Sequence, residues 1–398
     1  MYNEYFFVLD ALRADHLKYM PWLNQKTKEG VFSDNYTISE GFCERIEIFT
    51  KTKPIKLGFI TAMTLGYSNK FIYPYKWLRP NLAKYLALIE FNVFFTKVLR
   101  RVLWKSCSYF SNYPIYPQRI PLNILHKVGI TEDSFDFEKL SIQNKKGLIY
   151  KLKEKGFKIK WDLFTSLVSS IKMDDDMRFK ELLKFKNIKK VFIPIYIGLP
   201  DKIGHQFGPH SSELIDSLRD LDIKCKNIIS ELLKSNPKSG ITIIGDHGMD
   251  SVNTLINIDS ILYNIESSTG LKRFIDFDFF LDSTILRIWW IGDLINKKIF
   301  LKYLKEDREM KQKGCFFVSD ESENKIDSLN SIADFIWWAK KGVLISPDFF
   351  HTANTPKKGM HGYLDKDNPS SGFFLRIKND LKIDKIDKIK SGEIDELF

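Results

Sequence analysis

Apolar runs that fit buried strands alternate along this chain with stretches that fit helices. Residues 5–9, 191–197 and 241–244 are almost continuously apolar, which predicts strands buried inside a sheet. Shorter strand-like segments follow at residues 31–36 and 156–159. The chain is therefore expected to build its core around a central sheet.

Helical segments separate these strands. Residues 43–51 predict a short helix, and residues 211–235 predict a long amphipathic one with apolar side chains at helical spacing. The apolar positions of the long segment are Leu214, Ile215, Leu218, Leu221, Ile228, Ile229 and Leu232. Strands that alternate with helices indicate an α/β fold with a mostly parallel central sheet flanked by helices.

Two regions depart from this alternation. Residues 67–141 are rich in aromatic, proline and basic residues, and residues 264–332 contain strand-like segments of a smaller α+β unit. We predict that the first is a helical, aromatic insertion and the second a cap. The catalytic core then comprises residues 1–263, with the first insertion inside them, and residues 333–398. The charged alternation over residues 381–398 predicts a solvated terminal element.

Residues of the types that bind metals stand where three of the apolar runs end. The six candidate ligands, in four segments, are Asp10, Asp201, His205, Asp246, His247 and His361. In an open α/β sheet, ligands gather at the carboxyl ends of the strands, so we expect these side chains to meet at one rim. Three Asp and three His can hold two divalent cations and leave positions open for a substrate. Mixed Asp/His ligation suits zinc or manganese better than calcium.

The motifs that carry these ligands resemble those of a known superfamily. They are DxxxxD from residue 10, DxxGHxxGP over residues 201–209, GDHGM over residues 245–249 and HG at residues 361–362. In this order they resemble the alkaline phosphatase superfamily, closest to its type I phosphodiesterase/nucleotide pyrophosphatase and sulfatase-like branch. The resemblance implies an alkaline-phosphatase-like sheet flanked by helices, with a variable cap inserted before the last ligand.

The resemblance also implies how the ligands are divided and what they do. One ion would be held by Asp201, His205 and His361. The other would be held by Asp10, Asp246 and His247, beside the nucleophile. The reaction implied is hydrolysis or transfer at phosphate or sulfate esters through a covalent enzyme intermediate.

The nucleophile is where this sequence departs from the pattern. In the resembling phosphodiesterases a Thr or Ser opens a helix shortly before the dipeptide TG, but here an ungapped match on Thr50 places Gly41 there. Ser39 and Cys43 remain as candidates near the helix start, and a helix N-terminus lowers a thiol's pKa. Position favours Cys43. The third alternative is that no side chain attacks, and a metal-bound water or an acceptor hydroxyl does so.

Arg45 and four further histidines are the other polar residues whose roles the sequence leaves to be assigned. Arg45 is predicted either to bind a substrate phosphate with two hydrogen bonds or to pair with Glu44 or Glu47. The remaining histidines are predicted to be structural or surface residues: His16, His126, His210 and His351. Among them His210 lies closest to a ligand segment.

Composition and charge indicate which classes of partner the protein binds. The net charge of +11 favours anionic partners, and since no segment resembles a nucleic-acid-binding module, we expect phosphate esters and no nucleic acid. The four cysteines form no CxxC pair, and the N-terminus enters a strand at once, so a cytoplasmic protein is predicted. The basic, aromatic stretch near residues 97–105 fits either an interfacial helix, giving weak association with an anionic membrane, or an inserted helix packed on the core.

Three functions follow. The first is a two-metal-dependent hydrolase of phosphate esters that resembles a phosphodiesterase or nucleotide pyrophosphatase and acts on a small molecule or glycan. The second is a phospho-substituent transferase or a sulfatase-like enzyme that acts on a cell-surface glycan or its precursor. The third is a catalytically silent metal-binding protein.

Overall fold

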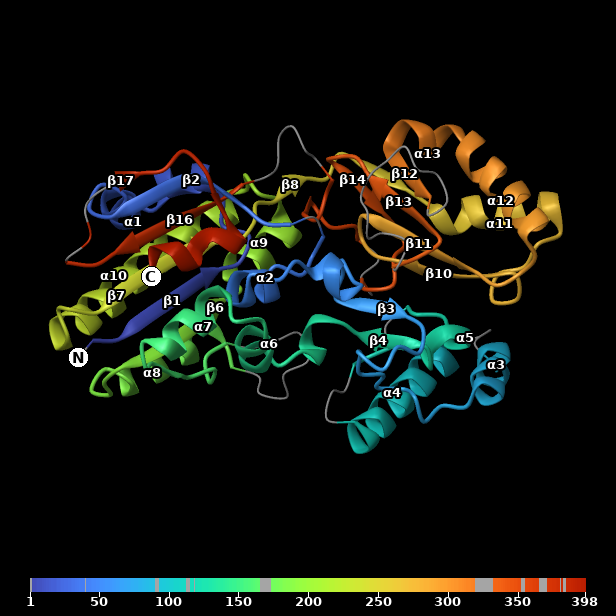
Figure 1. Cartoon of the computed structure of the whole chain (residues 1–398). Helices are drawn as coiled ribbons and strands as arrows, with labels where there is room; N and C mark the ends of the chain where they lie inside the picture. The colour runs from blue at the N-terminus through green and yellow to red at the C-terminus, as the bar shows by residue number, and fades with distance from the viewer. Residues whose placement is uncertain are drawn as a thin grey trace.

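A mixed eight-stranded sheet forms one half of the molecule in this computed structural model (Figure 1). The structure describes residues 2–39, 41–89, 93–111, 115–117, 119–164, 173–318, 332–351, 355–364, 371–379, 381 and 384–398. The strands of the sheet are β1 (Glu4–Leu9), β2 (Val31–Thr37), β5 (Lys158–Ile159), β6 (Val191–Ile197), β7 (Gly240–Gly245), β16 (Gly372–Ile377), β17 (Asp384–Lys385) and β18 (Ile389–Lys390). They are ordered β17-β2-β16-β7-β1-β6-β5, with β18 beside β2.

Parallel pairing at the centre of the sheet brings three strand ends together. β1 lies between β6 and β7 and is parallel to both, with Phe7 opposite Ile195 on one side and Ile243 on the other. β16 is antiparallel to β7 and β2, so the sheet is mixed towards that edge. The predicted α/β fold with a central sheet flanked by helices is confirmed.

Helices cover both faces of the sheet because side chains alternate along each strand. Tyr5, Phe7 and Leu9 pack in one core with α10, whereas Phe6 and Val8 pack in another core on the opposite face. The helices and short 3-10 segments on the first face are η1 (Ala14–Tyr19), α1 (Pro21–Lys26), α8 (Asp175–Lys184), α9 (Leu199–Phe207) and α10 (Ser212–Ser235). Those on the second face are α2 (Arg45–Thr50), α6 (Phe137–Asn144), α7 (Gly147–Glu154) and η5 (Ser391–Leu397).

A separate antiparallel sheet forms the cap at the other end of the molecule (Figure 1). Its strands, in the order β10-β11-β13-β12, are β10 (Phe277–Leu281), β11 (Ile285–Trp290), β12 (Gly314–Val318) and β13 (Phe335–Ala339). Its helices are α11 (Ile258–Thr269), α12 (Leu294–Glu306) and α13 (Arg308–Lys313). Because β13 pairs with β11 and β12, this sheet continues past residue 332, where the sequence pattern placed the end of the cap. The division into domains stays a prediction.

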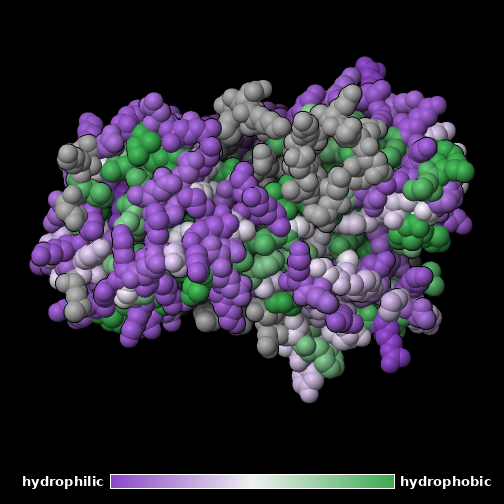
Figure 2. Space-filling view, in the orientation of Figure 1, coloured by the Kyte–Doolittle hydropathy of each residue, from purple (hydrophilic) through white to green (hydrophobic). Residues whose placement is uncertain are grey.

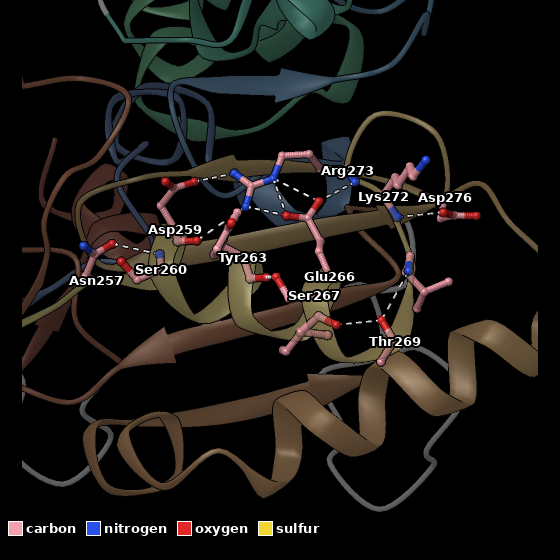
Figure 3. Close-up of polar contacts among 12 residues, drawn as sticks. Asn257, Asp259, Ser260, Tyr263, Glu266, Ser267, Thr269, Lys272, Arg273 and Asp276 are labelled. Atoms are coloured by element: carbon pink, nitrogen blue, oxygen red, sulfur yellow. Dashed lines mark hydrogen bonds and ion pairs between the residues drawn. The ribbon is translucent and has the colours of Figure 1, made fainter.

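Ion pairs fix the chain where α11 leads into the cap sheet. Arg273 Nε donates to Glu266 Oε2 at 2.8 Å, and its Nη1 lies 2.5 Å from Asp259 Oδ1, so one guanidinium ties the first turn of α11 and a later one to the following loop (Figure 3). Asp276 accepts the backbone N–H of Lys272 at 2.8 Å and closes the loop before β10.

The first insertion packs against the cap rather than standing alone. The insertion, residues 67–141, contains α3 (Pro80–Ile89), α4 (Val93–Phe110), α5 (Leu122–Leu125), β4 (Val128–Ile130) and η3 (Glu132–Ser134). It is preceded by η2 (Pro54–Leu57) and β3 (Met63–Leu65). Leu103 and Cys107 of α4 belong to the same apolar core as Phe277 and Phe300 of the cap. Two short strand pairs join the halves of the molecule: β9 (Thr254–Ile256) with β14 (Val343–Ile345), and β8 (Asp250–Ser251) with β15 (Gly359–Met360). Within the described residues, no helix combines the length and the apolar character needed to cross a bilayer.

The C-terminal segment differs from the prediction of a solvated element, which is wrong for its described part. Ile389 and Ile394 are buried in the core on one face of the sheet, and β18 pairs with β2. Phe398 lies under the Arg376 guanidinium, 3.7 Å from the ring centroid. Ile386 also packs against this core, so a segment with many charged residues still contributes apolar side chains to it.

Candidate metal centre

Two strand ends supply Asp10, Asp246 and His247. Asp10 directly follows β1, and its backbone N–H donates to Ile197 O of β6 at 3.0 Å. Asp246 directly follows β7, and its Oδ1 accepts the N–H groups of Ala11 and His247, each at 3.0 Å. One carboxylate oxygen therefore locks the ends of β1 and β7 together and leaves the other oxygen for a ligand.

The remaining three candidates come from a helix and a short strand. Asp201 lies in the first turn of α9, which begins after β6, and His205 lies one turn later on the same face. His361 follows β15, whose residue Gly359 accepts a hydrogen bond from the His205 ring. The short strand thus carries His361 to α9 although the two segments are far apart in sequence.

The six side chains form two adjacent groups of three. In one group, Asp201 Oδ1 lies 3.1 Å from His205 Nε2 and 3.6 Å from His361 Nε2. In the other, His247 Nε2 lies 3.2 Å from Asp10 Oδ1 and 3.9 Å from Asp246 Oδ1. Ligands bound about 2.1 Å from one tetrahedral ion are about 3.4 Å apart, so these spacings suit two small cations. The stacked rings of His247 and His361, with centroids 4.1 Å apart, join the groups.

Backbone carbonyls orient two of the imidazoles. His205 Nδ1 lies 2.8 Å from Gly359 O, and His247 Nδ1 lies 3.0 Å from Gly248 O. An Nδ1–H that donates to a carbonyl leaves Nε2 unprotonated and directed at the cluster, as in metal-binding histidines. Both rings therefore present the nitrogen that a metal ion requires.

Electrostatics also favour a cation here. Burial, followed by the charge of Asp10, raises the pKa of Asp246 to about 7 despite the neighbouring His247. Burial and the charge of Asp201 raise the pKa of Asp10 as well. Asp246 Oδ2 is buried and makes no hydrogen bond within the described residues. Because clustered buried carboxylates are costly unless a positive charge compensates them, the residues present fit a pair of divalent cations.

A cavity of about 330 Å³ opens over both groups, between the central sheet and the cap. The candidate ligands Asp10, Asp201, His205, His247 and His361 line it. Its other walls are formed by Phe42, Glu44, Arg45, Thr61, Ala62, Tyr196, Asp282, Ser283, Phe350, His351 and Met360. The Phe42 ring meets His361 edge-on at 5.2 Å, so an apolar wall adjoins the ligands.

Cys43, the favoured nucleophile on sequence grounds, is not among the residues that line this cavity. Its side chain is 3 % exposed and packs with Ile46 and Phe59 in a small apolar cluster. Its Sγ lies 4.0 Å from Thr131 Oγ1. Burial and the nearby Glu132 raise the pKa of the thiol well above its usual range, whereas a nucleophilic cysteine needs a lowered one. The placement therefore speaks against Cys43.

Ser39 and Gly41 give no better nucleophile. Ser39 does not line the cavity, and its backbone N–H donates to Glu47 Oε2 at 3.0 Å. Gly41 has φ of +117°, and a Cβ built there would lie 2.1 Å from Ile60 O. No side chain can therefore occupy position 41 unless the backbone moves.

Replacing Gly41 by Ala is expected to lower the free energy of unfolding by about 2 kcal/mol or more, because the left-handed φ and the collision with Ile60 O add. Urea denaturation would measure it. Gly58→Ala is the matched control, since Gly58 has φ of +91° but no atom within 4 Å of its added Cβ. Equal losses in both variants would contradict the collision.

Arg45 pairs differently from the two partners considered in the sequence. Its Nε donates to Glu132 Oε2 at 2.6 Å, and its Nη2 lies 3.7 Å from Asp133 Oδ1, so neither Glu44 nor Glu47 is its partner. Glu132 Oε1 also accepts the N–H of Ile46 at 2.8 Å. Arg45 still lines the cavity. The Glu132 carboxylate, however, already accepts from its guanidinium and from the backbone of the first turn of α2.

The structure adds residues that the sequence did not single out. His351, predicted to be a structural or surface residue, lines the cavity, and its Nδ1 lies 2.6 Å from Asp348 Oδ2. His210, the histidine closest in sequence to a ligand segment, is exposed and not in the lining. Tyr196 contacts Asp10 through its hydroxyl. Glu44 also lines the cavity, and burial and the charge of Asp246 raise its pKa. Of these residues, only Tyr196 could have been linked to the site from the sequence, because it stands near the end of a predicted strand.

Known proteins share both the sequence and the fold. The sequence profile of the family described as type I phosphodiesterase / nucleotide pyrophosphatase matches residues 129–364. Venom phosphodiesterase 2 of Crotalus adamanteus is 23% identical over 215 residues, and venom phosphodiesterase of Macrovipera lebetinus is 26% identical over 220. Each alignment covers 50% of this chain but only 25% and 24% of those relatives, so the chain matches about a quarter of their length.

Solved structures share the fold across the whole chain. Human ectonucleotide pyrophosphatase / phosphodiesterase 5 aligns over 99% of this chain and 93% of its own, with a TM-score of 0.65 and 14% identity. An inactive form of the murine protein, in complex with AMP, aligns over 100% and 94%, with a TM-score of 0.64 and 14% identity.

Proposed function

Since this chain belongs to the type I phosphodiesterase / nucleotide pyrophosphatase family, we propose that it is a two-metal-dependent phosphoric ester hydrolase of the phosphodiesterase type. The observation that carries the proposal is the convergence of two Asp/His groups beneath one cavity. Retention of both groups argues against a catalytically silent protein, because a purely structural role requires no such set.

The two groups have separate tasks in this proposal. Asp201, His205 and His361 hold one cation, and Asp10, Asp246 and His247 hold the other. When bound, two divalent cations stabilise the attacking and leaving oxygens of an in-line displacement at phosphorus. The chain itself fixes the ligands through Ala11, Gly248 and Gly359, so little rearrangement is needed on binding.

The cavity walls suit an ester with an apolar organic part. Phe42, Phe350 and Met360 provide apolar surface beside the ligands, and polar groups of His351 and Ser283 face the same space from the cap side. A small-molecule substrate fits about 330 Å³, and zinc is the proposed metal, with manganese as the alternative, because half of the ligands are imidazoles. The cytoplasmic location of the protein stays a prediction.

Turnover of bis(4-nitrophenyl) phosphate by chelator-treated protein with added zinc or manganese would test this proposal. We expect release of 4-nitrophenolate that depends on the metal and exceeds that from 4-nitrophenyl phosphate and 4-nitrophenyl sulfate. A rate equal to the buffer rate under every metal would favour a silent protein. Preference for the sulfate would favour the sulfatase-like alternative.

A second surface supports the proposed association with anionic membranes. Along α4 the outward side chains Phe95, Val98, Val102 and Tyr109 are exposed, opposite the buried Leu103. Three cations lie beside this apolar stripe, and none forms an ion pair within the described residues: Lys97, Arg101 and Lys105. Figure 2 shows pale and green residues at the lower edge, where α4 projects. An apolar stripe with flanking cations is typical of an interfacial helix.

Reversing two of these charges, in Arg101→Glu with Lys105→Glu, is expected to weaken binding to phosphatidylglycerol vesicles at least about 10-fold, because each cation near such a surface contributes about 1 kcal/mol. Vesicle sedimentation at low salt would measure it. Lys298→Glu with Lys302→Glu on exposed positions of α12 is the matched control and should bind like the unmodified protein. Absence of binding by the unmodified protein would rule out the surface.

A further inference from the structure

We propose that the oxygen which attacks phosphorus comes from outside the chain, from water or an acceptor alcohol, and that Glu44 accepts its proton. This inference rests on the proposed phosphoric ester chemistry and specifies its route. The displacement then takes one step, and no phosphorylated enzyme forms. Four features of the site carry the inference.

The first is the geometry at Gly41, which stands where the resembling phosphodiesterases have their nucleophile. The Phe42 N–H donates to Ile60 O at 2.9 Å, which holds the chain against a buried loop. A Cβ at position 41 would lie 2.1 Å from that same oxygen. The backbone is therefore shaped for a residue that has no side chain.

The second is the start of α2, where an acid occupies the position that would stabilise a covalent phosphoryl group. Glu132 is 1 % exposed, accepts the N–H of Ile46 at 2.8 Å and pairs with Arg45 at 2.6 Å. Its carboxylate takes the donors that a covalently held phosphoryl group would need. A second anion at this point would be repelled.

The third is that, among the described residues, the hydroxyl groups lining the cavity already contact other acceptors. Thr61 Oγ1 donates to Met63 O at 2.8 Å, and Ser283 Oγ donates to Asp348 Oδ2 at 2.9 Å. The Tyr196 hydroxyl contacts Asp10. The carbonyl that accepts from Thr61 is not a base and cannot take up the proton of the hydroxyl group. Asp348 Oδ2, which accepts from Ser283, also contacts His351 Nδ1.

The fourth is Glu44, a buried carboxyl that faces the cavity. It is 8 % exposed, lines the cavity beside Asp10 and His247, and its Oε2 makes no hydrogen bond within the described residues. A buried acceptor without a donor is costly, and an O–H group in the cavity would satisfy it. Glu44 Oε2 can thus accept the hydrogen of an attacking O–H that enters the cavity from outside the chain.

The step balances as a single displacement. The oxygen of water or alcohol forms a bond to phosphorus while the bond from phosphorus to the leaving oxygen breaks. The proton of the attacking O–H passes to the Glu44 carboxylate, and the leaving oxygen departs as the aryloxide or takes a proton from solvent. Water gives hydrolysis, and an alcohol gives transfer.

Stereochemistry at phosphorus decides between one step and two. We expect the protein with zinc to invert a single diastereomer of a thymidine 5′-phosphorothioate 4-nitrophenyl ester in ¹⁸O-labelled water, read by ³¹P NMR. Retention, or a phosphoryl adduct in the intact mass after acid quench, would overturn the inference and leave the proposed function standing. Absence of turnover on every ester would overturn both.

The role of Glu44 as proton acceptor is tested separately, by substitution. Glu44→Gln keeps the shape of the side chain but cannot accept a proton, so kcat should fall about 100-fold with little change in KM, and Glu44→Asp should recover part of it. Cys43→Ala should stay within about threefold of the unmodified protein. An unchanged kcat in Glu44→Gln, or a loss in Cys43→Ala as large as in Asp246→Asn, would overturn it. Added glycerol distinguishes the two sources, since a glycerol phosphodiester forms only if alcohols attack.

Discussion

Asp246→Asn is expected to lower kcat/KM for bis(4-nitrophenyl) phosphate by at least about 1,000-fold while the protein remains folded. The asparagine oxygen can still accept the N–H groups of Ala11 and His247, so the ends of β1 and β7 stay joined. What disappears is the negative charge of a buried carboxylate whose second oxygen has no hydrogen bond within the described residues. The loss would therefore report metal binding rather than folding.

The metal-free variant should also be at least as stable as the unmodified protein at pH 8. The pKa of Asp246 is about 7 in the folded chain and about 3.9 when unfolded, so ionisation at pH 8 destabilises the fold, and Asn removes that cost. Asp220→Asn, on an exposed position of α10, is the matched control and should keep full activity. Activity of Asp246→Asn within about tenfold of the control would refute the role assigned to this carboxylate.

Zinc added to chelator-treated protein is expected to raise Tm by at least about 5 °C, because an ion that binds only the folded state stabilises it. The gain should be larger at pH 8 than at pH 6. Binding requires an ionised Asp246 and a neutral His247. Burial opposes the charge on His247, but the carboxylates of Asp246 and Asp10 outweigh it and raise its pKa, and that of Asp246 is about 7. Protons therefore compete with the metal below neutral pH.

Differential scanning fluorimetry over this pH range would measure the effect, with His361→Ala and Asp201→Asn as variants that should show a smaller gain. His126→Ala, which removes a buried ring that lies outside the cavity lining, is the control and should keep the full gain. A zinc-induced shift that is equal at both pH values, or that survives loss of both groups, would show that zinc binds elsewhere.

The convergence of the candidate ligands could be predicted because their positions follow from local rules. β1, β6 and β7 are continuous apolar runs that must be buried, and parallel pairing places their ends at one rim, so Asp10, Asp201 and Asp246 had to converge. The long helix α10 followed in the same way from its apolar spacing. Where one periodicity determines both the element and its buried face, the sequence is sufficient.

The rest depends on contacts between distant segments. Glu132 reaches Arg45 and Ile46 across 87 and 86 positions, so no local pattern pairs them or shows that the start of α2 is occupied. His351, whose ring contacts Asp348, lines the cavity together with Ser283 of the cap, and no local pattern places these segments side by side. Likewise, the collision at Gly41 involves a carbonyl of a loop that follows α2. The sequence shows that glycine stands at position 41, but not that the carbonyl of Ile60 excludes a side chain there.

Anomalous X-ray scattering at the zinc edge, from crystals grown with zinc, tests the paired metal centre most directly. Two peaks are expected, one among Asp201, His205 and His361 and the other among Asp10, Asp246 and His247. Peaks confined to other residues, or none at either group in zinc-saturated crystals, would contradict it.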